Sequence, residues 1–243
     1  MDTELYILIP LVAMSVGLAK GGLGGAMGGM ITPLLSLFMD VPQAIAFALP
    51  LFIVADVFAL RSFWKIWDTH QLKLLLPPGL IGVGIGTYLL ANLSSGTLRD
   101  ILGILTLLVG LYKLAEPFLQ NLQFQPRLIH AIFAGGLTGI GSALASAGGP
   151  VLTGYLLFLR MEPRIFIGTS AVIFAAMNFT RLPALYLADV FEWDKFVFSM
   201  LFAPLAFAGV WLGRRFVDRI DREAFDKLMT VIMIVAGIVL IIQ

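Results

Sequence analysis

The stretch from Gly17 to Gly29 reads GLAKGGLGGAMGG and decides how the rest of the chain is interpreted. It interrupts an apolar region that covers residues 5–38. Glycine permits positive φ and close backbone approach, so this run predicts a break between two short helices. One charged residue, Lys20, lies inside the break. Irregular backbone at membrane depth is stable only inside protein or beside a water-filled cavity, so this break is the first candidate functional site.

The composition around this stretch is that of a membrane protein. Of 243 residues, 59% are hydrophobic and 13% are charged, and the mean hydropathy is +0.96. An ordinary soluble domain carries about 25% charged residues. A membrane span needs about 20 apolar residues, so the chain has room for roughly eight segments and for no nucleotide-binding domain. Its net charge of +1 does not indicate nucleic acid as a partner.

The apolar segments are too long and too continuous for the alternating strands of an outer-membrane barrel. We expect all of them to be helices, because only a helix satisfies its own backbone groups in hydrocarbon. They cover residues 5–19, 30–38, 41–60, 72–90, 98–115, 128–146, 151–159, 165–188, 196–212 and 225–242. The acidic start of the chain lacks the basic region of a signal peptide, so we expect the first segment to be retained.

A polar stretch near residue 120 separates two halves, 1–118 and 119–243, which resemble each other. Four residues of the first half recur in the second at a constant offset of 127: Pro77, Gly82, Gly86 and Gly110 match Pro204, Gly209, Gly213 and Gly237. A constant offset with similar flanking hydropathy predicts two transmembrane repeats. The glycines of this set also form small-xxx-small faces, which favour close helix packing.

The positions of lysine and arginine predict the topology. If each half contains a broken hairpin followed by three full crossings, nearly all basic residues fall on one side, which the positive-inside rule makes cytoplasmic. These residues are Arg61, Lys65, Lys73, Lys113, Arg127, Arg160, Arg164, Arg214, Arg215, Arg219, Arg222 and Lys227, against Arg99 and Lys195 opposite. This arrangement predicts both termini outside and two inverted repeats, whose broken hairpins enter from opposite faces.

The first break is a candidate anion site. Entering from outside, residues 5–19 descend about 22 Å, so Lys20 lies deep in the membrane. A charge at that depth is a functional candidate by default, although Lys20 could instead extend toward the interface or pair structurally. Helix N-termini after the break direct unpaired N–H groups toward an anion. The other candidate residues of this break are Gly21, Gly22, Gly24, Gly25, Gly28 and Gly29.

The second half carries matching candidates. Its break covers residues 139–150, with Ser142, Ser146, Gly148 and Gly149 as candidate ligands and Pro150 suited to begin the next helix. Tight packing is the alternative for this segment.

Further along, Thr169 and Ser170 precede Asn178 and Arg181, which share a helix face because they are three residues apart. A guanidinium suits a bidentate oxyanion contact. Alternatively, Arg181 reaches the outer interface near Asp189.

Asp56 is the one acidic residue well inside an apolar run. It could couple transport to protons or pair with Lys20 or Arg181, or it could pair at the interface near Arg61. We expect no metal site, because the chain has no cysteine and its two histidines, His70 and His130, are far apart. No catalytic motif of an intramembrane hydrolase is present, so we expect no enzyme and no cofactor.

Taken together, the glycine-rich motifs resemble the sulfite exporter TauE/SafE family. The resemblance rests on residues 17–29 with Pro33-Leu34-Leu35, on Gly148-Gly149-Pro150 with Tyr155-Leu156-Leu157, on Gly168-Thr169-Ser170-Ala171 and on Asn178-xx-Arg181. It covers essentially the whole chain. It implies an inner-membrane permease for sulfite or small organosulfonates, driven by the proton gradient. It also implies that Lys20, both breaks and the face of Asn178 and Arg181 belong to the anion pathway, where relatives often carry lysine in place of Arg181.

The sequence therefore predicts an all-α polytopic membrane protein that transports a small sulfur-containing anion by alternating access. A passive anion channel and a non-transporting scaffold or sensor are the alternatives. The expected partners are the anion and the lipid bilayer, with the chain acting as a monomer or a homodimer.

Overall fold

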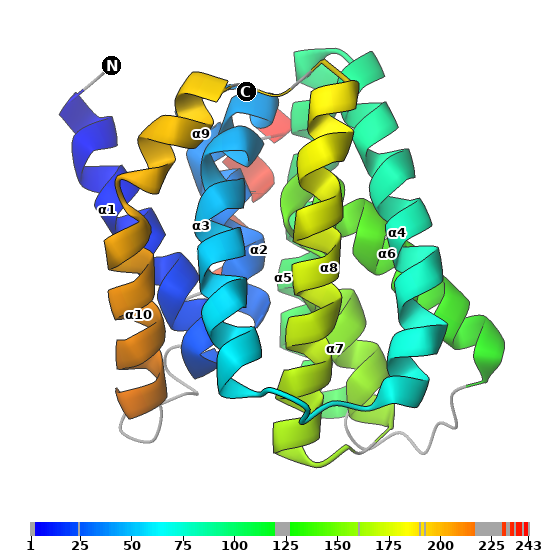
Figure 1. The fold of residues 1–243 in the computed structure, drawn as a ribbon. Coiled ribbons are helices and arrows are strands. Elements are labelled where there is room, and N and C mark those ends of the chain that lie inside the picture. The colour runs from blue at the N-terminus through cyan, green and yellow to red at the C-terminus, as the bar shows by residue number, and fades with distance from the viewer. Residues whose placement is uncertain are drawn as a thin grey trace.

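The computed structural model describes residues 3–23, 25–119, 127–159, 161–189, 191 and 193–216. Of the last predicted helix it describes residues 230–231, 234–235, 237–239 and 241–242. Every regular element within these ranges is a helix, which confirms the all-α prediction. The chain folds into a bundle of long helices that run roughly along one common direction (Figure 1).

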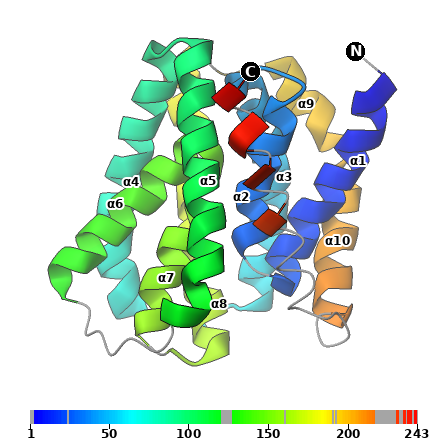
Figure 2. The same ribbon diagram turned by 180° about the vertical axis from the view of Figure 1, so that it is seen from behind.

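The elements follow the predicted segments closely. The first half contains α1 (Thr3–Leu18), the π-helical turn η1 (Ala19–Leu23), α2 (Gly25–Ser36), α3 (Val41–Ser62), α4 (Thr69–Asn92) and α5 (Ser95–Leu119). The second half contains α6 (Leu128–Ala145), α7 (Gly149–Phe158), α8 (Pro163–Leu187), α9 (Trp193–Met200) and α10 (Ala203–Phe216). The start of α1 and the last described residues of the chain lie at the same end of the bundle (Figures 1 and 2).

Four helices in the described residues are long and apolar enough to cross a bilayer. They are Val41–Ser62, Thr69–Asn92, Leu128–Ala145 and Arg164–Leu187. Many large apolar side chains on the outside of the bundle are exposed, among them Tyr88, Leu137 and Leu187, as expected of a surface that faces lipid. The chain is therefore a multi-pass membrane protein. The helix α6, expected as one arm of a broken hairpin, is by itself long enough to span.

Both breaks are shorter than the glycine-rich runs that predicted them. In the first, η1 ends at Leu23 and α2 already begins at Gly25, so the later glycines of the run are helical. In the second, α6 continues to Ala145 and α7 begins at Gly149. The prediction that Pro150 lies at the start of a helix is confirmed. Glycines remain helical where neighbouring helices pack tightly on them, because packing outweighs their low propensity of about 1 kcal/mol.

The predicted single helix 196–212 is wrong in one respect, because the structure divides it into α9 and α10 with a turn at Leu201 and Phe202. Pro204 explains the division. It has no N–H to continue the ladder of α9, and it fits the first turn of α10. The turn is closed by hydrogen bonds from the N–H of Leu201 to the carbonyl of Phe198 and from the N–H of Phe202 to that of Ser199.

Two helix pairs pack through glycine at closely similar positions. Figure 1 shows α1 beside α10 on one side and α4 beside α6 on the other, with α3 and α8 between them. A Cβ on Gly17 would overlap the backbone of Ala206 and Val210, and one on Gly139 would overlap the backbone of Gly79 and Val83. Ala206 and Val210 lie 127 residues after Gly79 and Val83. The offset found in the sequence therefore recurs in the contacts.

The converse contacts show the same relation. A Cβ on Gly209 would overlap the carbonyl of Met14 and come close to Leu18, and one on Gly82 would overlap the carbonyl of Gly136 and come close to Ile140. Both partners of Gly82 lie 122 residues after those of Gly209. These glycine contacts of α1 with α10 thus recur at equivalent positions in the contact of α6 with α4.

Candidate functional site

A cavity of about 120 Å³ lies between the first break, the second break and the helix α8. This volume is well above the roughly 10–15 Å³ needed for one water molecule. Its walls come from η1, α3, the end of α6, the start of α7 and one face of α8. The lining residues are Ala19, Lys20, Phe52, Ala59, Ser142, Ser146, Gly149, Thr153, Phe166, Ile167, Ser170, Ala171, Phe174 and Asn178.

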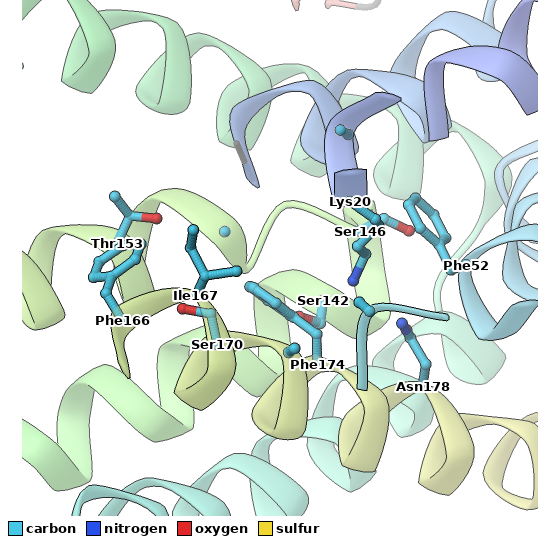
Figure 3. A pocket seen from close by; sticks show the side chains of 14 residues that line it. Lys20, Phe52, Ser142, Ser146, Thr153, Phe166, Ile167, Ser170, Phe174 and Asn178 are labelled. Atoms are coloured by element: carbon cyan, nitrogen blue, oxygen red, sulfur yellow. The ribbon is translucent and has the colours of Figure 1, made fainter. Parts of the chain in front are cut away.

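The two ends of the cavity differ in charge. Figure 3 shows Lys20, Ser146, Asn178 and Phe52 together at the polar end, and Thr153, Phe166, Ile167 and Ser170 toward the uncharged end. The polar end therefore offers a cation, a hydroxyl and an amide to a bound molecule. The uncharged end offers aromatic and aliphatic surface together with two hydroxyl groups.

A buried ion pair borders the polar end. The Nζ of Lys20 lies 2.5 Å from Oδ1 of Asp56, and the Nδ2 of Asn178 donates to Oδ2 of the same carboxylate at 2.6 Å. The Asp56 side chain is fully buried, and that of Lys20 is 16% exposed. Burying a carboxylate is unfavourable unless its oxygens are paired, and these two contacts occupy both of them.

Two aromatic rings also contact the Lys20 ammonium. Its Nζ lies 4.7 Å from the ring centroid of Phe174 and 5.8 Å from that of Phe52. Cations within about 6 Å of an aromatic face are attracted by the ring quadrupole. The η1 turn, a rare form often found at functional sites, thus holds Lys20 between α3 and α8.

Arg181 lies behind the second break rather than in the cavity wall. It is 1% exposed, and its guanidinium donates to Oγ of Ser146 at 3.2 Å and to the carbonyl of Ala143 at 2.9 Å. Its Nε is buried without a hydrogen-bond partner among the described residues. Ser146 also accepts a hydrogen bond from Thr32 of α2 at 2.9 Å. Ser146, at the end of α6, therefore contacts both α2 and α8 beside the cavity.

The second break is built by the backbone. Ser146 follows α6 in a left-handed conformation, with φ of 53°, and the N–H of Ala147 bonds the carbonyl of Gly141 at 3.0 Å. Gly148 lies directly against α6, where a Cβ would overlap Oγ of Ser142 and the carbonyl of Thr138. These contacts turn the chain sharply and bring Ser142, Ser146 and Gly149 to the cavity.

Six of the residues predicted from the sequence as site residues line the cavity: Lys20, Ser142, Ser146, Gly149, Ser170 and Asn178. Asp56 and Arg181 contact members of this set. Gly21 packs against Val210 of α10, and Gly148 packs against α6. Gly22 lies in η1, Gly25, Gly28 and Gly29 lie in α2, and Gly24 lies outside the described residues.

Thr169 has a different place. Its hydroxyl accepts a hydrogen bond from the backbone N–H of Asp68 at 2.9 Å. Next to it, a Cβ on Gly168 would overlap the carbonyl of Ile66. Gly168 and Thr169 therefore hold the connection between α3 and α4 against the start of α8.

Two of the alternatives weighed from sequence are wrong. Asp56 does not pair with Arg61, because Lys20 and Asn178 occupy its carboxylate. Arg181 does not extend to the outer interface near Asp189, because it is buried against Ser146 and Ala143.

Sequence reasoning missed the aromatic part of the site. Phe166, Ser170, Phe174 and Asn178 are each four residues apart, so they form one stripe along α8. That spacing from Asn178 could have identified both phenylalanines. Thr32 gave no such signal, because its partner lies 114 residues away in sequence.

No group of three or more histidine, aspartate or glutamate side chains in the described ranges is arranged to hold a metal ion. His130 instead accepts a hydrogen bond from the backbone N–H of Arg127 at the start of α6.

The long apolar helices and the cavity between the two breaks are features of a multi-pass membrane protein with an internal polar site. The family model described as sulfite exporter TauE/SafE matches residues 9–240. The chain belongs to this family, whose members are transporters rather than enzymes. No curated protein and no solved structure matches the chain.

Proposed function

We propose that this chain is a secondary permease of the inner membrane that moves a small organosulfonate or sulfite-like anion. The observation that carries the proposal is the cavity between the two breaks, with Lys20 in its wall and Arg181 directly behind it. Lys20 pairs with Asp56, but Arg181 contacts only neutral oxygens among the described residues. A buried cation is unfavourable without an anionic partner, and an oxyanion is a suitable one. Hydroxyl groups of Ser142, Ser146 and Ser170 would replace part of the anion's hydration shell.

The two ends of the cavity support an organic anion in particular. Lys20 and Asn178 would bind the sulfonate group, and Phe166 and Ile167 would contact a short carbon chain. An inorganic anion would leave the aromatic and aliphatic side chains of the uncharged end without a partner. We therefore place organosulfonates ahead of sulfite as the substrate class.

We further propose two inverted repeats, 1–118 and 119–243, each with a broken hairpin and three crossings. The reciprocal glycine contacts of α1 with α10 and of α6 with α4 support this arrangement. Among the described residues, most lysines and arginines lie near the connections at one end of the bundle (Figure 1), and we assign that end to the cytoplasm. Both termini then lie outside.

Alternating access follows from this symmetry. The residues of α8 that line the cavity precede Arg181, and Arg181 itself is buried one turn further along. The cavity thus extends toward the assigned cytoplasmic end. Exchange of contacts between the two repeats would open it to the other side, as in other transporters with inverted repeats.

Asp56 is our candidate for proton coupling. Protonation of its carboxylate would release Lys20, which would then be free to bind a second negative charge on the anion. Proton binding would therefore be linked, through this one side chain, to the binding of an anion that carries two negative charges.

A thermal-shift assay of the purified chain in detergent tests the proposal. Ethanesulfonate, sulfite and thiosulfate should raise the unfolding temperature, and acetate should do so less, because binding to the folded state stabilises it. Lys20→Met should abolish the shift, and Lys73→Met, which removes an exposed lysine from α4, should retain it. A shift with acetate alone would contradict the assignment of sulfur-containing anions.

A further inference from the structure

The charged side chains in and directly behind the polar end of the cavity carry unequal numbers of positive and negative charges. Lys20 and Arg181 are cationic, and Asp56 is anionic. Lys20 is compensated by Asp56 at 2.5 Å, whereas Arg181 contacts only the neutral oxygens of Ser146 and Ala143 in the described part of the chain. With Asp56 ionised, the three residues leave one uncompensated positive charge. Such a charge is strongly unfavourable in a low-dielectric interior.

Other charged residues of the elements around Asp56 lie near helix ends. The helix α2 contains no acidic or basic residue. Within the described residues, Lys20 is the cation that pairs with Asp56. The remaining charged residues of these elements are Glu4 in α1, Arg61 in α3, Arg99, Asp100, Lys113 and Glu116 in α5, Arg164 in α8, Asp194 and Lys195 in α9, and Arg214 and Arg215 in α10.

We infer that the charge of the bound anion decides whether a proton is bound with it. This inference rests on the proposed anion site. A monoanion compensates Arg181 and leaves the site neutral while Asp56 stays ionised. A dianion would leave the site with one excess negative charge, which a proton on Asp56 removes.

The geometry provides a place for that proton. It would pass from water to Oδ1 of Asp56, the oxygen that now contacts Lys20. Lys20 would then turn its ammonium toward the second negative charge of the anion. Oδ2 would keep its hydrogen bond from Asn178, so the carboxyl group would remain in position.

Titration calorimetry on the purified full chain tests this rule with two anions of fixed charge. Ethanesulfonate is a monoanion and ethane-1,2-disulfonate is a dianion throughout the pH range used. For one linked proton, we expect the affinity for the disulfonate to rise about tenfold for each unit by which pH falls, across the range in which Asp56 titrates. The affinity for ethanesulfonate should change less than about twofold, since no proton is linked to its binding.

Two variants complete the experiment. Asp56→Asn should make disulfonate binding independent of pH, because the site no longer contains a carboxylate. Asp100→Asn makes the same change at an exposed position of α5 and should keep the pH dependence. The comparison of the two anions on the unaltered chain holds even where Asp56→Asn fails to fold.

The possible results distinguish a failure of the charge rule from a failure of the proposed anion site. Equal pH dependence for both anions would overturn the charge rule and leave the anion site standing. Binding of neither anion would overturn the proposed function, and the charge rule with it.

Discussion

At the scale of single residues, the site depends on one buried ion pair. The position of Lys20 in a break after the first helix could be predicted from the glycine-rich run around it. The choice of partner could not be predicted, since Asp56 lies 36 residues away and its distance from Lys20 depends on how α3 packs. Local spacing identified Asn178 and Arg181 as two residues on one helix face. It did not predict that Asn178 would bind Asp56 and that Arg181 would bind Ser146.

A double-mutant cycle tests this ion pair. Lys20→Met alone leaves the Asp56 carboxylate buried without its cation, which should lower the free energy of unfolding by about 3–5 kcal/mol. Adding Asp56→Asn removes the orphaned charge and should restore most of that loss. Unfolding of the purified variants in detergent measures both steps. Strictly additive losses would show that the two side chains do not interact.

At the scale of helices, a glycine can either break a helix or let another helix pack closely, and sequence alone does not distinguish these two roles. The runs at both breaks predict irregular backbone, yet the helix α6 continues through Gly139 and Gly141 to Ala145. Gly139 serves close packing, because it lies directly against the backbone of Gly79 in α4. The existence of both breaks was therefore predictable, and their length was not. It depends on which neighbouring helix occupies the space that glycine leaves.

Two glycines of α4 provide a matched test of this packing. A Cβ on Gly82 would overlap the carbonyl of Gly136 in α6, whereas Gly84 has nothing within 4 Å. Gly82→Ala should destabilise the protein by about 1–3 kcal/mol through overpacking. Gly84→Ala should be neutral or slightly stabilising, since alanine favours helix. Equal unfolding temperatures in detergent would contradict the close contact of α4 with α6.

At the scale of the whole molecule, the distribution of charge predicts the topology, whereas the partners of each helix come from the structure. The sequence predicts a topology with nearly all basic residues on one side, because a membrane orients loops by their lysines and arginines. It did not predict that α1 packs on α10 and α6 on α4. In both pairs, a helix of one half packs on a helix of the other half. This pairing depends on the shapes of surfaces that are far apart in sequence, and no local sequence pattern predicts it.

Cysteine labelling tests the topology directly, because the chain contains no cysteine. Gly96→Cys at the start of α5 should react with a membrane-impermeant maleimide in intact cells. His70→Cys at the start of α4 should react only after the membrane is permeabilised. Both positions are exposed, so access to the reagent differs only through the membrane. The reverse labelling pattern would invert the proposed orientation.

The most direct test of the account is transport through the cavity in proteoliposomes. With an acidic exterior and an alkaline lumen, the unaltered chain and Lys73→Met should accumulate radiolabelled ethane-1,2-disulfonate above its external concentration. Lys20→Met and Arg181→Met should each reduce the initial rate at least about tenfold, the effect expected for losing a buried charged contact. Equilibration without accumulation would indicate a channel. An unchanged rate in a variant that carries both substitutions would contradict the assignment of the cavity as the anion pathway.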